Sequence, residues 1–166
     1  RAKQYEFGQD YLKIKASADD IFGLGYPSFA AVRQSEFQME IQCRIESRCK
    51  EAGITLYMDE RHHYDIYLNN DGCVVLRYTI GCVSKEMQSV QVQGNHAAIK
   101  IAADALGYRF YIMENDTEKT ELGYADTRYL SSEVASGFTG VMIGLYAVDD
   151  AEQTALFTDL MISHDE

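Results

Sequence analysis

The chain has 166 residues, a length that suits one domain with a full hydrophobic core, and 46% of its residues are hydrophobic, as in a globular protein. Its net charge of −11 argues against nucleic acid and against an anionic membrane surface, because both are bound by basic faces. No stretch approaches the ~18 consecutive apolar residues that a membrane-spanning helix needs. We therefore predict a single globular domain, residues 1–166, with neither nucleic acid nor membrane as a partner.

Alternation of apolar and polar residues with a period of two is the dominant pattern along the chain. In residues 36–45 every odd position from Phe37 to Ile45 is apolar and every even position is polar. This pattern gives a strand one buried and one wet face, whereas a helix would scatter the same side chains around its axis. Similar alternation recurs in residues 54–58, 64–68, 74–80, 99–103, 108–112, 141–145 and 156–162.

Turn sequences separate these segments. Residues 69–72 read Asn-Asn-Asp-Gly, in which Gly72 can take a positive φ, and residues 114–120 are typical of a second hairpin turn. Residues 96–106 contain good helix formers, but their alternation favours a strand. A short helix is compatible only with residues 131–135. About ten short strands joined by turns predict an all-β sandwich or barrel.

The chain carries no motif of a nucleophilic, phosphate-binding or zinc-dependent enzyme. His62 and His63 are adjacent, so on a strand they face opposite ways and cannot share a metal, and the four cysteines form no CxxC pair. The 26 acidic residues prevent any assignment of a glycosidase carboxylate pair by sequence. We expect no catalytic residue, no metal ligand and no cofactor, apart from a structural calcium ion that Asp159 or a loop carboxylate could bind.

The aromatic residues leave direct sugar binding open. Sandwiches that bind sugars use exposed aromatic platforms, and this chain has 12 Tyr but no Trp. Tyr67, Tyr111, Tyr124 and Tyr129 are the candidates for such a platform, although core or interface packing is the more frequent role of tyrosine.

The most specific segment is residues 121–147. It contains Glu121-Leu122-Gly123, then Arg128-Tyr129-Leu130-Ser131, then Gly137-Phe138-Thr139-Gly140, and it ends in Leu145-Tyr146-Ala147. This order resembles the C-terminal concanavalin A-like β-sandwich domain of family 43 glycoside hydrolases, the β-xylosidases and α-L-arabinofuranosidases. In that family a strand ends at the leucine-glycine pair. Further collinear segments that resemble the family are residues 11–15 (its first strand), 27–29, 33–34 and 51–64.

The resemblance implies an antiparallel jelly-roll sandwich that is accessory to an inverting glycosidase. The catalytic carboxylates would lie on a β-propeller that is absent from these 166 residues, so the chain alone is expected not to be catalytic. Phe138 and Thr139 would reach the substrate pocket of the propeller, and Arg33 and Gln34 would support the fold or the contact between domains. The alternative for Phe138 is a place in the core.

The resemblance also implies partners. These are the catalytic β-propeller and a xylo- or arabino-oligosaccharide, whereas the sequence leaves open whether copies of the chain form a homo-oligomer. The compartment is left open, with the bacterial cytoplasm or periplasm as the expectation.

Thr120 stands where the family has tryptophan, and Thr127 and Ser136 stand where it has glycine. Two alternatives remain, a free-standing lectin-like module and a small glycanase with a cleft on one sheet.

Overall fold

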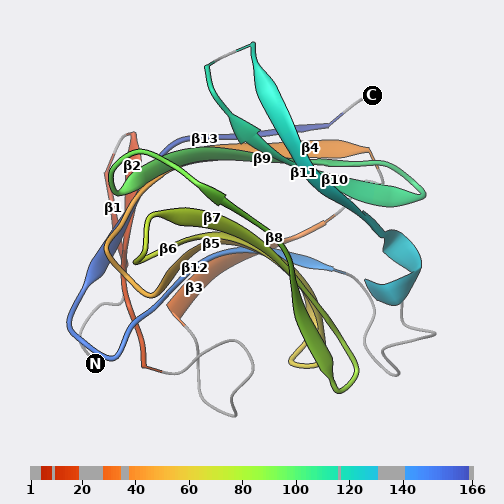
Figure 1. Ribbon diagram of the computed structural model, residues 1–166, viewed down its shortest axis with the longest axis horizontal. Helices are drawn as coiled ribbons and strands as arrows, with labels where there is room; N and C mark the ends of the chain where they lie inside the picture. The colour runs from red at the N-terminus through yellow and green to blue at the C-terminus, as the bar shows by residue number, and fades with distance from the viewer. Residues whose placement is uncertain are drawn as a thin grey trace.

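The computed structural model describes residues 5–8, 10–18, 28–34, 38–115, 117–130 and 141–164. These segments form thirteen strands and one short 3-10 helix (Figure 1). Their bounds are β1 Tyr5–Phe7, β2 Tyr11–Lys15, β3 Ser28–Arg33, β4 Met39–Glu46, β5 Glu51–Asp59, β6 His62–Asn69, β7 Cys73–Ile80, β8 Val83–Gln91, β9 His96–Ala103, β10 Gly107–Met113, β11 Lys119–Asp126, η1 Thr127–Leu130, β12 Met142–Val148 and β13 Thr154–His164.

The strands form two stacked sheets (Figure 1). The seven-stranded sheet has the order β1-β2-β13-β4-β9-β10-β11, and the six-stranded sheet has the order β3-β12-β5-β6-β7-β8. Neighbouring strands within each sheet are antiparallel. The prediction of an all-β antiparallel sandwich is therefore confirmed.

The main core lies between the two sheets and consists of the inward face of each strand. In β4 the burial alternates along the strand, as the sequence predicts. Each fully buried Leu, Ile or Phe side chain contributes about 1.5–3 kcal/mol relative to exposure. The largest apolar side chains with almost no exposure are Ile14, Ile45, Phe110 and Phe157 of the seven-stranded sheet, and Ile54, Leu56, Ile66, Leu68 and Leu76 of the six-stranded sheet.

The turn at residues 69–72 fixes the register of β6 and β7. Gly72 has φ = 77°, and the Asn69 side-chain oxygen accepts bonds from the backbone N–H groups of Asp71 and Cys73 at 3.0 and 2.9 Å. The turn places Asp65 opposite Arg77 in the ladder. A local turn sequence therefore sets a charged cross-strand pair several residues away.

Some details of the sequence prediction are wrong. Tyr11–Lys15 is the second strand of the described chain, because Tyr5–Phe7 precedes and pairs with it. Leu122 and Gly123 lie inside β11 instead of ending a strand. Strand β8 was not predicted, because almost all of its side chains are exposed and it shows no apolar alternation. Residues 96–103 form a strand, as predicted, and residues 131–135 lie outside the described residues.

Candidate functional site

Four residues were predicted from the family resemblance to contact a substrate pocket or a second domain. Phe138 and Thr139 lie outside the described residues. Arg33 is the last residue of β3, and its backbone pairs with Met142 of β12. Gln34 follows directly and accepts a hydrogen bond from the Tyr108 hydroxyl at 2.8 Å. The structure therefore describes the surroundings of the predicted site but not Phe138 and Thr139 themselves.

The chain that leads into residues 131–140 is firmly attached to the sandwich. Helix η1 begins at Thr127, whose N–H donates to the Leu106 carbonyl at 3.1 Å and whose hydroxyl donates to the Ala105 carbonyl at 3.1 Å. The helix ends at Leu130, which is buried. Together these contacts fix the position and direction of the chain at residue 130.

The chain that leaves residues 131–140 is attached as well. The Gln34 N–H donates to the Val141 carbonyl at 2.7 Å, and Met142 then enters the ladder between Arg33 of β3 and Tyr57 of β5. Arg33 and Gln34, which the sequence placed near a domain contact, thus hold the second end of the segment through their backbones. Strand β12 lies inside the six-stranded sheet, so this end has strand neighbours on both sides.

An aromatic cluster lies beneath the first end. Tyr64 contacts Tyr78, Tyr108 and Phe110, with ring centroids 4.9, 6.0 and 6.4 Å away. The Tyr64 hydroxyl donates to the Asp126 carbonyl at 2.6 Å, and the Tyr78 hydroxyl donates to the Tyr124 carbonyl at 2.7 Å. Burial raises the pKa of Tyr78 and of Tyr108 to about 12, so both hydroxyls keep their protons and act as donors at neutral pH.

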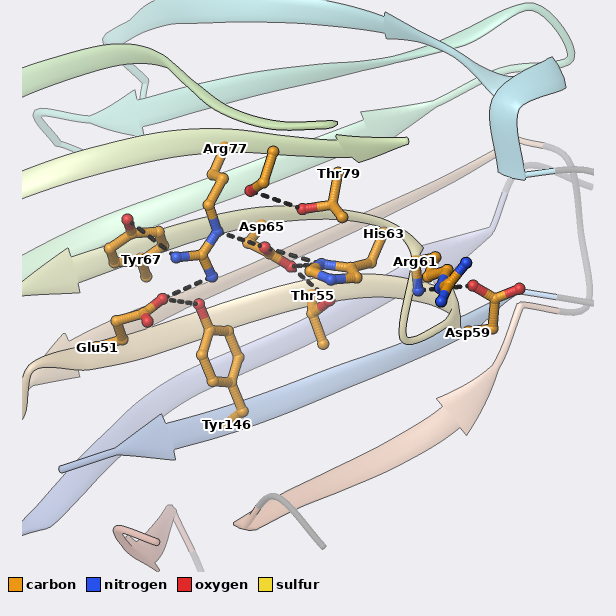
Figure 2. A network of polar contacts seen from close by, with 11 residues as sticks. Glu51, Thr55, Asp59, Arg61, His63, Asp65, Tyr67, Arg77, Thr79 and Tyr146 are labelled. Carbon is orange, nitrogen blue, oxygen red and sulfur yellow. Dashed lines mark hydrogen bonds and ion pairs between the residues drawn. The ribbon is translucent and has the colours of Figure 1, made fainter. Parts of the chain in front are cut away.

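A second arrangement of functional groups lies on the outer face of the six-stranded sheet, the face turned away from the other sheet (Figure 2). Asp65 of β6 is at its centre and is fully buried. Its carboxylate accepts bonds from the Thr55 hydroxyl at 2.7 Å and from Arg77 Nε at 3.0 Å, and it contacts His63 Nδ1 at 2.8 Å. We call this group and the residues bonded to it the Asp65 network.

The Asp65 network continues through Arg77 to a second carboxylate. An Arg77 terminal nitrogen lies 2.7 Å from Glu51 Oε1, which also accepts a bond from the Tyr146 hydroxyl at 3.2 Å. The Arg77 guanidinium lies over the Tyr67 ring, 4.7 Å from its centroid. Strands β5, β6, β7 and β12 each contribute at least one of these side chains.

The electrostatics of the network favour a charged Asp65. Burial alone would raise the pKa of this carboxyl, but its interactions with His63, Arg77 and Thr55 outweigh burial and hold the pKa below its ordinary value. Burial alone would lower the pKa of Arg77, but the neighbouring Tyr146, Asp65 and Glu51 outweigh burial and raise this pKa above its ordinary value. Both groups are therefore ionised at neutral pH and form a buried ion pair.

This chemistry does not suit glycoside hydrolysis. A glycosidase needs two carboxyl groups that flank a sugar bond, one of them kept protonated as the acid. Here Arg77 lies between Glu51 and Asp65 and binds both. The Asp65 network is thus an internally bonded group that joins four strands, and it offers no pair of carboxylates to a substrate.

Residues 2–160 match the family described as the β-xylosidase C-terminal concanavalin A-like domain. The chain belongs to this family. It is 30% identical over 145 residues to the non-reducing end α-L-arabinofuranosidase BoGH43B of Bacteroides ovatus, an alignment that covers 82% of this chain and 27% of that protein. The predicted family and the concanavalin A-like fold are therefore confirmed.

Solved structures of family 43 proteins share the fold of this domain. The xyloglucan PUL GH43B protein of Bacteroides ovatus superposes with a TM-score of 0.86 at 25% identity, covering 98% of this chain and 34% of that one. The BlXynB K247S mutant of Bacillus licheniformis gives a TM-score of 0.86 at 16% identity, covering 93% and 33%. The β-xylosidase C-terminal domain thus spans about a third of the length of these relatives.

The candidate tyrosines, all of which lie in described segments, do not form an aromatic row. Tyr67 is buried in the Asp65 network, whereas Tyr124 and Tyr129 are 43% and 36% exposed. Tyr111, Tyr124 and Tyr129 each lie beneath a different cation, those of Lys119, Arg109 and Arg128 respectively. The lectin-like alternative predicted a row of exposed tyrosines on one sheet face, and the described residues show separate cation–aromatic pairs instead.

The described part of the domain also bears on metals and membranes. Across it, no group of three or more His, Cys, Asp or Glu is placed to hold a metal ion, and Asp159 pairs with Arg44 at 3.1 Å. The calcium ion stays a prediction. None of the described segments forms a helix of the length and apolarity that crossing a bilayer requires.

Sequence reasoning missed the Asp65 network. The alternation in residues 64–68 puts Asp65 and Tyr67 on the face of a strand opposite Tyr64, Ile66 and Leu68, but it did not predict that this second face is buried as well. The register set by the turn at residues 69–72 could have revealed the pairing of Asp65 with Arg77. The contribution of Glu51 depends on the curvature of the sheet and on side-chain reach, neither of which alternation encodes.

Proposed function

We propose that this domain is the accessory part of a glycosidase that releases xylose or arabinose, and that it packs against a catalytic β-propeller in the rest of the protein. In this proposal residues 131–140 bring Phe138 and Thr139 to one side of the substrate pocket of the propeller. The observation that carries it is the attachment of both ends of this segment to the sandwich, through η1 on one side and Gln34 on the other. A segment held at both ends can position a side chain reproducibly.

The Asp65 network supports the same proposal. The two carboxylates that come together on a sheet face are both bound by Arg77, so they serve the stability of the sandwich. Chemistry at a glycosidic bond would then fall to two carboxyl groups elsewhere in the protein, with inversion at the anomeric carbon. The names of the relatives, which include an α-L-arabinofuranosidase and a xylosidase/arabinosidase, support this assignment.

The test is a Phe138→Ala substitution in the longer protein that contains this domain. We expect KM for a p-nitrophenyl xyloside or arabinofuranoside to rise by about tenfold, because the substituted residue would only form a wall of the pocket and the carboxylates would be intact. Met87→Ala, which removes an exposed side chain on β8, is the matched control and should leave KM unchanged.

Two outcomes would contradict the pocket role. An unchanged KM in Phe138→Ala would show that this side chain does not line the substrate pocket. A loss of about 3–5 kcal/mol of unfolding free energy on Phe138→Ala would instead place this side chain in the core, since that is the usual cost of truncating a buried Phe. Thermal unfolding of the same preparations separates these results.

A further inference from the structure

A groove of about 390 Å³ lies on the outer face of the seven-stranded sheet. Ala98 of β9 lies at its floor. One wall comes from the hairpin between β10 and β11, which stands out beyond this sheet (Figure 1) and contributes Met113 and Asn115. The opposite wall comes from β13 and contributes Leu160 and Met161. The groove is on the opposite side of the sandwich from the Asp65 network.

The β13 wall exists because of a bulge. The pairing of β13 with β4 shifts between Thr158 and Met161, so Asp159 and Leu160 together lie opposite the single residue Cys43 and β13 carries one extra residue. Asp159 has φ = 52°, in the left-handed region that side chains other than Gly, Asn and Asp rarely adopt. Bulges of this kind redirect side chains and are frequent beside binding sites. Here the bulge brings the Asp159 carboxylate to Arg44 of β4, 3.1 Å away.

The polar groups of the groove are held by internal bonds that leave specific atoms for a ligand. The Asn115 oxygen accepts bonds from the Thr117 N–H, the Thr117 hydroxyl and the Glu118 N–H at 2.9, 3.0 and 2.7 Å, so its Nδ2 group is the part that can donate. Gln42 Nε2 lies 3.5 Å from Met161 Sδ, which leaves Gln42 Oε1 as an acceptor. Arg44 and Asp159 together add further donors and an acceptor without net charge.

We propose that this groove binds a short neutral oligosaccharide, as a site separate from any catalytic pocket. Fixed donors and acceptors beside Met113, Leu160 and Met161 match a sugar ring, whose hydroxyls need both kinds of partner and whose C–H groups pack on apolar walls. An anion would meet the Asp159 carboxylate in a chain of net charge −11, and a cation would find one carboxylate already paired with Arg44. A neutral polyhydroxyl ligand meets neither obstacle.

The test is isothermal titration of the 166-residue chain with xylohexaose, with arabinoxylan oligosaccharides as a second probe. The choice of these probes rests on the proposed function, whereas the groove itself does not. We expect saturable binding that Gln42→Ala weakens about tenfold, because one fixed hydrogen bond is lost. Gln88→Ala on β8 of the other sheet is the matched control and should bind as the unaltered chain does.

Asp159→Gly separates binding from stability. Glycine adopts φ = 52° without strain, which offsets the extra conformational freedom that it gives the unfolded chain. This variant should therefore unfold at about the same temperature, yet it should bind about tenfold more weakly because Arg44 loses its partner. Binding that survives both Gln42→Ala and Asp159→Gly would overturn the proposal, as would the absence of saturable binding to xylo-, arabino- and cello-oligosaccharides. Binding of cellohexaose alone would support the groove and contradict the proposed substrate class of the longer protein.

Discussion

At the scale of single residues, the ionic group around Arg77 joins four strands of the six-stranded sheet, β5, β6, β7 and β12. A buried ion pair adds little net stability compared with apolar residues of the same shape, but removing one partner is costly because the other charge stays buried. Arg77 contacts Asp65 and Glu51 on two neighbouring strands, so any change in strand register would leave at least one carboxylate without its cation. We infer that the Asp65 network reinforces the register that the turn at residues 69–72 sets, and that it extends this constraint to β5.

Arg77→Met should therefore destabilise the domain by about 3–5 kcal/mol, since it removes the cation from the buried Asp65 and from the partly buried Glu51. Chemical denaturation monitored by circular dichroism measures this loss. Adding Asp65→Asn to Arg77→Met should recover part of it, because the second substitution removes one of the stranded charges. Additive losses in the double variant would contradict the coupling of the two residues.

The lowered pKa of Asp65 makes stability depend on pH in a defined window. A carboxyl whose pKa is lower in the folded than in the unfolded state stabilises the fold above its unfolded value of about 3.9 and loses that contribution as the pH falls through the folded value. The unfolding free energy should therefore decrease on acidification below about pH 4. Asp65→Asn should show a smaller decrease, and the exposed Asp71→Asn should behave like the unaltered chain. Parallel pH curves for all three proteins would contradict this role of Asp65.

At the scale of strands, alternation predicted the elements that have one buried and one wet face, such as β4, and residues 69–72 were predicted as a turn. It failed for β8, whose side chains are exposed on both faces, because an edge strand with no buried face has no apolar period. Alternation also predicted one buried and one wet face for β6, whereas both faces of this strand are buried. Burial of an outer sheet face depends on curvature and on neighbouring strands that are distant in sequence.

Gly53 of β5 lies where the backbones of β5 and β6 leave no room for a side chain. A Cβ atom at this position would lie 2.0 Å from the Ile66 carbonyl oxygen and 2.6 Å from Tyr67 Cα, both backbone atoms of β6. Gly53→Ala should separate the two strands and cost about 1–3 kcal/mol or more. Gly123→Ala in β11 is the matched control, because its nearest contact is a side-chain methyl group of Leu76 at 2.7 Å instead of backbone, and it should cost less. Equal losses in thermal unfolding would contradict this explanation.

At the scale of the whole molecule, the fold and the family were predictable from strand alternation and from the order of residues 121–147. The candidate site was predictable only in part. Arg33 and Gln34 were identified through the resemblance, and the structure shows how their backbones and the Gln34 side chain hold the chain beside Val141. The groove beside Asp159 could not be predicted. A bulge in β13 and the projecting hairpin between β10 and β11 form its walls, and neither feature produces a regular alternation of apolar and polar residues.

We propose that this sandwich assists a catalytic domain in a longer protein and performs no hydrolysis itself. The most direct measurement is the turnover of p-nitrophenyl xyloside and p-nitrophenyl arabinofuranoside by the purified 166-residue chain, compared with the longer protein that contains it. We predict no turnover by the chain alone and clear turnover by the longer protein. Turnover by the folded chain that persists through repeated purification would contradict the account, because the sandwich would then have an active site of its own.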